Sequence, residues 1–244
     1  MSVVIARDIV TVAGPDAARY LQGQLSNDVN SLAEGASCWS FLLEPAGVLG
    51  HLVRVARRAE DRFELDTDDG AGDAVVARLR RFLIRTKAEL STGAGRVSLD
   101  GHGLIGWWGE GEHGWTDDAL TPDSHATAAR LDAGWPGPAE LNEGRIPAET
   151  GVVPVAASFT KGCYTGQELV ARIDSRGNNV PHRLRVVELG APAHPGDAVL
   201  VGGVEQGRLT SVAGLRAFAY VHRSVEVPAA AEVGGAAATV GPQR

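Results

Sequence analysis

The sequence predicts an α+β protein in two parts: an antiparallel sheet with packed helices over residues 1–175, and a small antiparallel β-barrel over residues 176–244. Two observations carry this prediction. The first 83 residues read as strand, helix, three strands and helix, an order typical of helices on an antiparallel sheet. From residue 183 onward, short apolar runs separated by Gly and Pro are typical of a small barrel.

The first part opens with the run Val3–Val12, which is rich in Val and Ile and predicts a β-strand. Gly14-Pro15-Asp16 ends this strand and starts a helix. The apolar face of that helix carries Ala17, Leu21 and Leu25. Further strands are expected at residues 39–43, 49–55 and 63–66. A second helix is expected from Asp69 to about Leu83, because apolar residues recur there at helical spacing.

Residues 101–144 are rich in Gly, acidic residues and Trp, and we expect loops with short elements there. Residues 101–106 match G-x-G-x-x-G, but a dinucleotide fingerprint needs a helix after it, and Trp107-Trp108-Gly109 opens a helix poorly. Barrel strands are expected at residues 183–189, 198–201, 207–212 and 217–225. Residues 229–240 are interpreted as either one final strand or a frayed tail.

The composition excludes several classes of protein. The net charge of −7 argues against direct nucleic-acid binding. The two cysteines, Cys38 and Cys163, form no C-x-x-C pair, so a reducing, cytoplasmic compartment is expected. Arg7 and Asp8 break the amino-terminal apolar run, which argues against a signal peptide, and no apolar window approaches about 20 residues. The seven histidines show no metal-ligand spacing, so no metal site is expected.

The segment Lys161-Gly162-Cys163-Tyr164-Thr165-Gly166-Gln167-Glu168 is the most informative part of the chain. It places Cys163 in a turn between two glycines, with Lys161 two residues before it. A nearby lysine lowers the pKa of a thiol and raises its thiolate fraction. A functional thiol and a buried structural cysteine are both consistent with this pattern, because free cysteines are often buried.

Two other features point to a bound ligand. Cationic side chains cluster just past the cysteine turn: Arg172, Arg176, His182, Arg183 and Arg185. They form either an anion pocket, since Arg forks match carboxylates and phosphates, or a solvated surface. Trp135, beside a Gly/Pro turn, either stacks on a flat heterocycle or packs in the core.

Several motifs together resemble the YgfZ-type folate-binding proteins, relatives of the glycine-cleavage T-protein. Residues 161–168 resemble the KGCYxGQE signature of this family, and residues 20–29 resemble its YLQGQxTxDV segment. Residues 42–47 resemble its LLDPxGR turn, and residues 144–147 its short G-x-P element. The resemblance covers most of the chain to about Leu189 and extends more loosely over the predicted barrel.

The resemblance implies a T-protein-like folate-binding region and a role in iron–sulfur cluster assembly or repair that indirectly supports tRNA-modifying enzymes. The implied ligand is tetrahydrofolate or a one-carbon derivative, and the implied partners are iron–sulfur proteins or cluster-assembly factors. Cys163 corresponds to the functional thiol of the family, with Lys161 beside it. The residues expected to bind folate are Asn27, Asp28, Trp135, Tyr164, Gln167, Glu168, Arg172, Arg176 and Arg183.

Two alternatives stay open at this point. One is a tetrahydrofolate-dependent aminomethyltransferase, and the other is a non-catalytic scaffold with a structural cysteine. The chain departs from the family pattern at Glu44, where Asp is usual, and at Val48, where Arg or Lys is usual. The chain is also short for the family. We therefore expect an accessory protein rather than a classical enzyme, with no membrane contact and an oligomeric state that the sequence leaves open.

Overall fold

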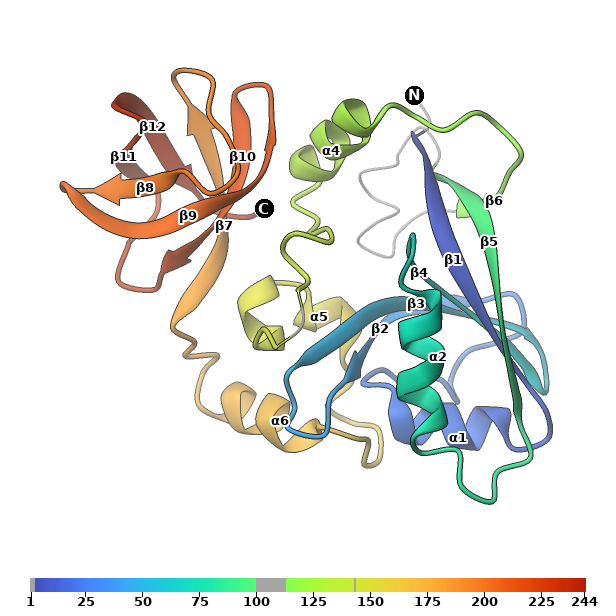
Figure 1. The fold of residues 1–244 in the computed structure, drawn as a ribbon. Coiled ribbons are helices and arrows are strands. Elements are labelled where there is room, and N and C mark those ends of the chain that lie inside the picture. The colour runs from blue at the N-terminus through green and yellow to red at the C-terminus, as the bar shows by residue number, and fades with distance from the viewer. Residues whose placement is uncertain (1–2, 100–112, 143) are drawn as a thin grey trace.

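The computed structural model describes residues 3–99, 113–142 and 144–244, and Figure 1 shows their arrangement. The G-x-G-x-x-G match at residues 101–106 lies outside this part of the chain. A sheet with helices on both faces forms the first part, and a barrel at the carboxyl end forms the second. The predicted fold class is confirmed. Among the described residues, no helix is long and apolar enough to cross a membrane.

The sheet is antiparallel, with β1 near its centre and strand order β2-β3-β4-β1-β5-β6. The strands are β1 (Val3–Ala13), β2 (Ser37–Leu43), β3 (Leu49–Ala59), β4 (Arg62–Asp68), β5 (Glu89–Leu99) and β6 (His113–Trp115). The sequence predicted the first four of these strands but not β5. The middle of β5 is Gly93-Ala94-Gly95, which has low strand propensity. The segment is a strand because it pairs with β1 along its whole length, although its local strand propensity is low.

One face of the sheet packs against helices α1 (Ala17–Gln24) and α2 (Gly72–Arg80). Successive strand residues point to opposite faces, so Leu42 joins this core while its neighbour Phe41 joins the other. The second helix is shorter than predicted. It begins at Gly72, whose N–H donates to Asp8 Oδ2 at 2.8 Å, and Phe82 follows its end in a turn while still packing on the core.

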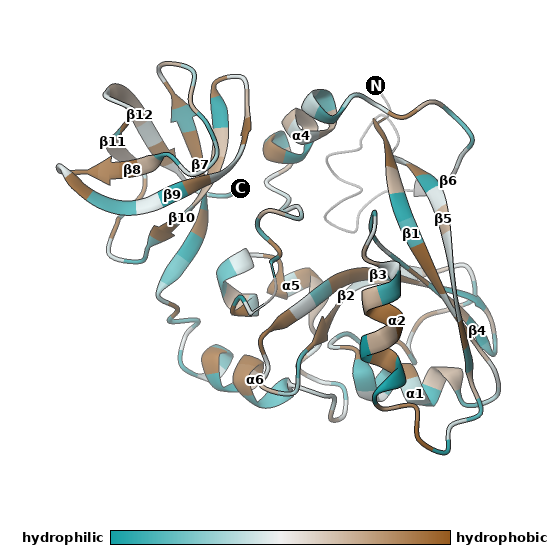
Figure 2. Ribbon diagram, viewed as in Figure 1, coloured by the Kyte–Doolittle hydropathy of each residue, from teal (hydrophilic) through white to brown (hydrophobic). Residues whose placement is uncertain are grey.

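The other face packs against α4 (Asp123–Asp132), the 3₁₀ turn η1 (Pro147–Thr150), α5 (Val153–Ala156) and the loop that leads to α6 (Gln167–Ser175). Figure 2 shows apolar residues on β2, β3 and α5 where these elements meet. The ten-residue helix α4 lies in the segment expected to be mainly loops. Its sequence holds little apolar periodicity, and only Leu131 of the helix is buried.

The barrel is closed, in the order β10-β7-β12-β11-β8-β9. Its strands are β7 (His182–Leu189), β8 (Ala198–Val201), β9 (Val204–Ala213), β10 (Arg216–His222), β11 (Ala229–Val233) and β12 (Ala236–Gly241). The expectation of one final strand or a frayed tail over residues 229–240 is wrong. This segment is a hairpin, because Gly234 and Gly235 adopt φ values of 58° and 82°, as a tight two-residue turn requires.

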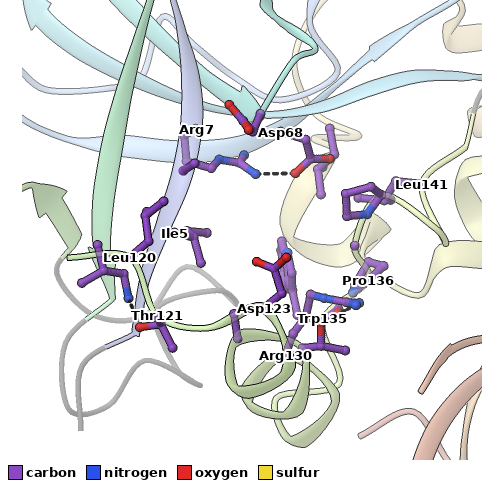
Figure 3. A pocket seen from close by; sticks show the side chains of 18 of the residues that line it. Ile5, Arg7, Asp68, Leu120, Thr121, Asp123, Arg130, Trp135, Pro136 and Leu141 are labelled. Atoms are coloured by element: carbon purple, nitrogen blue, oxygen red, sulfur yellow. Dashed lines mark hydrogen bonds and ion pairs between the residues drawn. The ribbon is translucent and has the colours of Figure 1, made fainter. Parts of the chain in front are cut away.

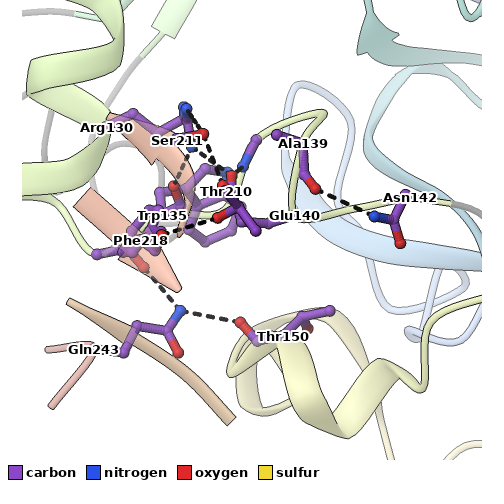
Figure 4. Close-up of polar contacts among 12 residues, drawn as sticks. Arg130, Trp135, Ala139, Glu140, Asn142, Thr150, Thr210, Ser211, Phe218 and Gln243 are labelled. Carbon is purple, nitrogen blue, oxygen red and sulfur yellow. Dashed lines mark hydrogen bonds and ion pairs between the residues drawn. The ribbon is translucent and has the colours of Figure 1, made fainter. Parts of the chain in front are cut away.

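A buried polar cluster joins the barrel to the first part of the chain (Figure 4). The fully buried Glu140 accepts hydrogen bonds from Arg130 at 2.8 Å and from Ser211 at 2.7 Å. Gln243 near the carboxyl end donates to the carbonyls of Gly134 and Thr150. Between the two parts, α6 ends at Ser175 and β7 begins at His182. We propose that the boundary between 175 and 176 divides the chain, with this cluster holding the parts together.

Candidate functional site

A cavity of about 450 Å³ lies between the sheet and α4 (Figure 3). Segments far apart in the sequence build it: the start of β1, the middle of β2 and β3, the end of β4, and residues 120–141. Its walls include Ile5, Trp39, Leu52, Leu120, Thr121, Trp135, Pro136 and Leu141, together with the charged residues Arg7, Asp68, Asp69, Asp123 and Arg130. The volume falls in the range typical of small-molecule sites, as does the mixture of apolar walls and a few polar groups.

The charged end of the cavity is organised around Arg7. Its guanidinium donates to Asp66 Oδ1 at 2.9 Å and contacts Asp68 Oδ1, a pair that Figure 3 marks. Burial opposes the charge, but Asp68 and Asp66 together raise the pKa of Arg7 above its ordinary value. Asp68 Oδ2 accepts no hydrogen bond from the described residues, and 30% of this side chain is exposed. The site therefore offers a carboxylate oxygen, fixed in place, to a donor on a ligand.

Two tryptophans form a wall of the cavity. The ring centroids of Trp39 and Trp135 lie 4.7 Å apart, with the planes tilted by 44°. Both side chains are buried. The indole N–H of Trp39 is also buried and has no acceptor among the described residues. Leaving such a donor unsatisfied costs about 1–3 kcal/mol, and buried polar groups without partners in native proteins are rare.

Cys163 lies on the loop before α6, and its side chain is exposed. The interpretation of a buried structural cysteine is therefore wrong. The loop is held against the first part of the chain, since Thr165 N–H donates to Gly23 O at 3.0 Å. Gly166 has a φ of 82°, and a Cβ there would lie 2.6 Å from Glu44 O, so only glycine fits. Cys163 does not line the cavity, so the thiol and the cavity are separate features of the surface.

The side chain of Lys161 bonds the backbone around the end of α1, and its expected role beside Cys163 stays a prediction. Its ammonium group donates to three backbone carbonyls at the end of α1: Gln22 and Leu25 at 2.6 Å, and Asn27 at 3.0 Å. The Gln22 and Leu25 carbonyls belong to the negative carboxyl end of the helix, where a cation is favoured, and Asn27 follows in the loop. Burial lowers the pKa of Lys161 to about 8. Among the described residues, its side-chain contacts fix the loop to α1, and none joins it to the Cys163 thiol.

Asn27 and Asp28 hold the corner between α1 and β2. The side-chain amide of Asn27 donates to Trp39 O at 2.9 Å and to Val155 O at 3.0 Å. Asp28 accepts from Gln22 Nε2 at 2.9 Å. Neither residue lines the cavity, although Asn27 supports the backbone of Trp39, which does. Their expected role in direct folate binding stays a prediction, and their observed contacts indicate a supporting role.

The rest of the signature is divided between the core and the surface. Tyr164 is buried in the same core cluster as Trp39 and Trp135, and burial raises its pKa to about 12. Its backbone N–H donates to the Gln167 side chain at 3.2 Å, which fixes the start of α6. Glu168 is exposed in the first turn of that helix. None of these three residues lines the cavity, and their role in folate binding stays a prediction.

The predicted arginines lie at the end of α6 and in β7, with Arg172 in the last turn of the helix and Arg176 directly after it. Arg172, Arg176 and Arg183 are exposed, and none of them lines the cavity. Arg183 donates to Asn178 O at 3.3 Å. That they bind the anionic tail of folate stays a prediction. Of the expected folate-binding residues, the structure places only Trp135 in the cavity wall.

The sequence reasoning missed Arg7, Trp39, Asp68 and Arg130 as site residues. Three of them had a usable signal. Arg7 is a charge within a predicted strand, Asp68 lies two residues after the predicted strand 63–66, and Trp39 begins another. A charge inside an otherwise apolar strand marks a buried ion pair or a site. The described residues hold no group of three or more His, Cys, Asp or Glu side chains that suits a metal ion.

Comparison with known proteins agrees with the sequence motifs. Over 201 residues the chain is 29% identical to an uncharacterised protein of Haemophilus influenzae. Over 215 residues it is 28% identical to the mitochondrial iron–sulfur cluster assembly factor IBA57 homologue of Pyricularia oryzae, and over 217 residues it is 26% identical to the tRNA-modifying protein YgfZ of an Enterobacter species. The chain is a relative of the YgfZ-type proteins. This confirms the resemblance predicted from residues 161–168.

Each of these matches includes 70% of this chain, but they span 67%, 53% and 66% of the three relatives. No protein-family model matches the chain. The solved structure of the glycine cleavage system aminomethyltransferase T from Bartonella henselae superposes with a TM-score of 0.82, covering 98% of this chain and 85% of that one. Identity between these two is 16%, so this likeness establishes the shared fold.

Proposed function

We propose that this protein binds tetrahydrofolate and assists the assembly or repair of iron–sulfur clusters, thereby supporting tRNA-modifying enzymes indirectly. The observation that carries the proposal is the cavity of about 450 Å³ walled by Trp39 and Trp135. The proposed process comes from the names of two relatives, because one is an iron–sulfur cluster assembly factor and another a tRNA-modifying protein. The ligand and the client proteins are inferred, and the following contacts support them.

The residues in the cavity suit the chemistry of a pterin. A flat heterocycle gains from apolar contact with indole faces, and Trp39 and Trp135 supply these. A pterin carries N–H donors, and a carboxylate oxygen accepts such a donor in a charge-assisted hydrogen bond. Asp68 is held by Arg7 with one oxygen left over for this role. In this arrangement the sheet supplies the recognition groups, and α4 with residues 135–141 closes the opposite side.

We assign the exposed thiol of Cys163 to contact with the iron–sulfur proteins that this chain would serve. It lies outside the cavity on a loop fixed by Lys161 and Gly166. An exposed thiol in a rigid loop suits transient contact with a partner, whereas the cavity suits a ligand that stays bound. The shared fold of an aminomethyltransferase does not by itself favour one-carbon transfer in this chain, because folds host many functions.

The proposal is tested by titrating the purified protein with tetrahydrofolate in a calorimeter and following tryptophan fluorescence in parallel. We expect saturable heat and a fluorescence change, because Trp39 and Trp135 line the site. Replacing Asp68 with Asn keeps its shape but weakens the acceptor, and should reduce affinity about tenfold, as loss of a charged hydrogen bond implies. Absence of heat and of a fluorescence change at millimolar ligand would remove the folate part of the proposal.

A further inference from the structure

Five arginines lie along the chain from α6 into β7 and directly after β10, and no carboxylate among the described residues forms an ion pair with any of them. They are Arg172, Arg176, Arg183, Arg185 and Arg223. Elsewhere on the barrel the pattern differs: Arg208 pairs with Glu205 at 2.9 Å, and Arg216 pairs with Glu188 at 2.7 Å. The chain as a whole carries a net charge of −7, so these cations without acidic partners contrast with the rest of it.

A tight turn holds two of these arginines in place. Gly177 and Asn178 both adopt left-handed backbone, with φ of 74° and 55°. Arg183 donates to Asn178 O at 3.3 Å, and the Arg223 guanidinium contacts Asn179 Oδ1. The backbone N–H of Arg223 also donates to Pro181 O at 3.0 Å. Two guanidinium groups are thereby fixed beside one turn before any ligand arrives, which lowers the entropy cost of binding.

The strand register places two arginines at one end of the barrel. Leu184 of β7 packs with Leu131 and Tyr220 outside the barrel, whereas Val187 and Leu189 belong to the barrel core. Alternation along the strand puts Arg183 and Arg185 on the same face as Val187. Burial and the charge of Arg183 both lower the pKa of Arg185, so the two cations interact. This end of the barrel is the one that the connection from α6 enters (Figure 1).

The cation cluster also lies within reach of Cys163. Helix α6 has nine residues and separates the cysteine loop from the turn at Gly177. At about 1.5 Å per residue the helix is roughly 14 Å long. A standard protein interface covers about 800 Å² on each partner, a patch about 30 Å across. One partner of ordinary size therefore spans both features.

We propose that the five arginines are a docking surface for an acidic segment of a partner protein, which brings its reacting group to Cys163. This inference rests on the proposed role of Cys163 in serving client proteins. Guanidinium forks bind carboxylates in a bidentate manner, and a fixed cluster selects a compact group of them. A long nucleic acid fits less well, because it would cross the acidic remainder of the chain beyond a screening length of about 8–10 Å.

The test uses a fluorescein-labelled octaglutamate peptide, with octaglutamine as the matched peptide, and fluorescence anisotropy of the full chain at low salt. We expect binding of octaglutamate alone, weakened by added salt. The double variant Arg185→Gln/Arg223→Gln should bind about tenfold more weakly. Arg208→Gln, on the same barrel but paired with Glu205, should bind as the wild type does. Arg185→Gln alone is a second variant, because the Asn178–Asn179 turn bonds Arg183 and Arg223 and not Arg185, so its loss should not disturb the fold.

Equal binding by the wild type and the double variant, or equal binding of the two peptides, would overturn the proposal. Tighter arginine-dependent binding of an eight-nucleotide single-stranded RNA would overturn it in favour of a nucleic-acid surface. The double variant is also titrated with folates. If its affinity for polyglutamyl tetrahydrofolate falls more than its affinity for the monoglutamate, the surface binds the folate tail and the docking proposal is overturned. Peptide binding that persists when wild-type protein fails to bind tetrahydrofolate would leave the docking surface standing and remove the folate proposal.

Discussion

Trp39 of β2 and Trp135, which follows α4, pack with ring centroids 4.7 Å apart and together wall the cavity. This contact joins the sheet to the segment that links it to the barrel. The carboxylate of Glu140, five residues after Trp135, then bonds Ser211 of the barrel. The candidate ligand site and the junction of the two parts of the chain are therefore built on the same short segment.

Trp135 should contribute to both binding and stability. Trp135→Ala removes a buried indole, and we expect the free energy of unfolding to fall by about 3–5 kcal/mol. Trp135→Phe keeps an aromatic face, so it should fold and bind tetrahydrofolate several-fold more weakly. Denaturant unfolding and calorimetric titration measure the two effects. Unchanged affinity in Trp135→Phe together with unchanged affinity in a folded Trp135→Leu would exclude stacking at this position.

The two cysteines should differ in reactivity. Cys163 is exposed, whereas Cys38 is half-buried and burial raises its pKa to about 11. At pH 8 Cys38 therefore remains a protonated thiol, and iodoacetamide should modify Cys163 first. Mass spectrometry of the native protein resolves the two sites. Cys163→Ala should keep the stability of the wild type yet fail to support cluster enzymes in a deletion strain, while Cys38→Ala should support them. Full function of Cys163→Ala would refute the role of the thiol.

Lys161 should titrate near pH 8, because burial lowers its pKa to about that value from 10.5. The folded state then releases this proton more readily than the unfolded state does. Between pH 8 and about 10.5 the unfolded chain holds more protons at this site, so stability from this group rises with pH in that window. Unfolding measured from pH 7 to 10.5 for wild type and Lys161→Met gives the difference. The free energy of unfolding of the wild type minus that of Lys161→Met should rise with pH, and a fall would contradict the lowered pKa.

Glu140 should be critical for the junction. It is fully buried and accepts from Arg130, from the Gly137 N–H at 2.8 Å and from Ser211. Glu140→Ala leaves the Arg130 charge without this partner, and breaking a buried pair in this way costs about 3–5 kcal/mol. Glu205→Gln is the matched control, because it disturbs an exposed pair on the same barrel and should leave unfolding nearly unchanged. Equal effects of the two substitutions would mean that the buried cluster does not hold the parts together.

The sequence predicted the elements whose local pattern agrees with their environment. Val3–Val12 and the barrel strands alternate or cluster apolar residues as strands do, and the structure confirms them. The strand β5 escaped prediction because Gly93-Ala94-Gly95 carries no local signal and takes its order from β1. The final hairpin was missed because alanine-rich strands resemble a tail. Only the Gly234-Gly235 turn, with left-handed backbone at both residues, marks it as a hairpin.

The candidate site was less predictable because it depends on long-range contacts. Trp135 was foreseen from its neighbours, but Trp39, Arg7 and Asp68 reach the cavity only through the order of the strands in the sheet. The contacts of Lys161 and Asn27 could not be predicted for the same reason. In the sequence, Lys161 lies near Cys163 and Asn27 lies beside Asp28. In the folded chain, the side chains of Lys161 and Asn27 donate to backbone carbonyls instead. Sequence spacing identified the important segments and could not assign their contacts.

The most direct test of the folate site follows the indole N–H resonances of the five tryptophans during a titration with tetrahydrofolate. Single Trp→Phe variants assign the Trp39 and Trp135 signals. We predict that these two resonances shift together and saturate with one ligand, because both rings wall the cavity, and that the N–H of Trp39 moves furthest as its unsatisfied donor meets a new environment. Saturation that leaves both resonances in place would contradict the account and put the ligand elsewhere on the protein.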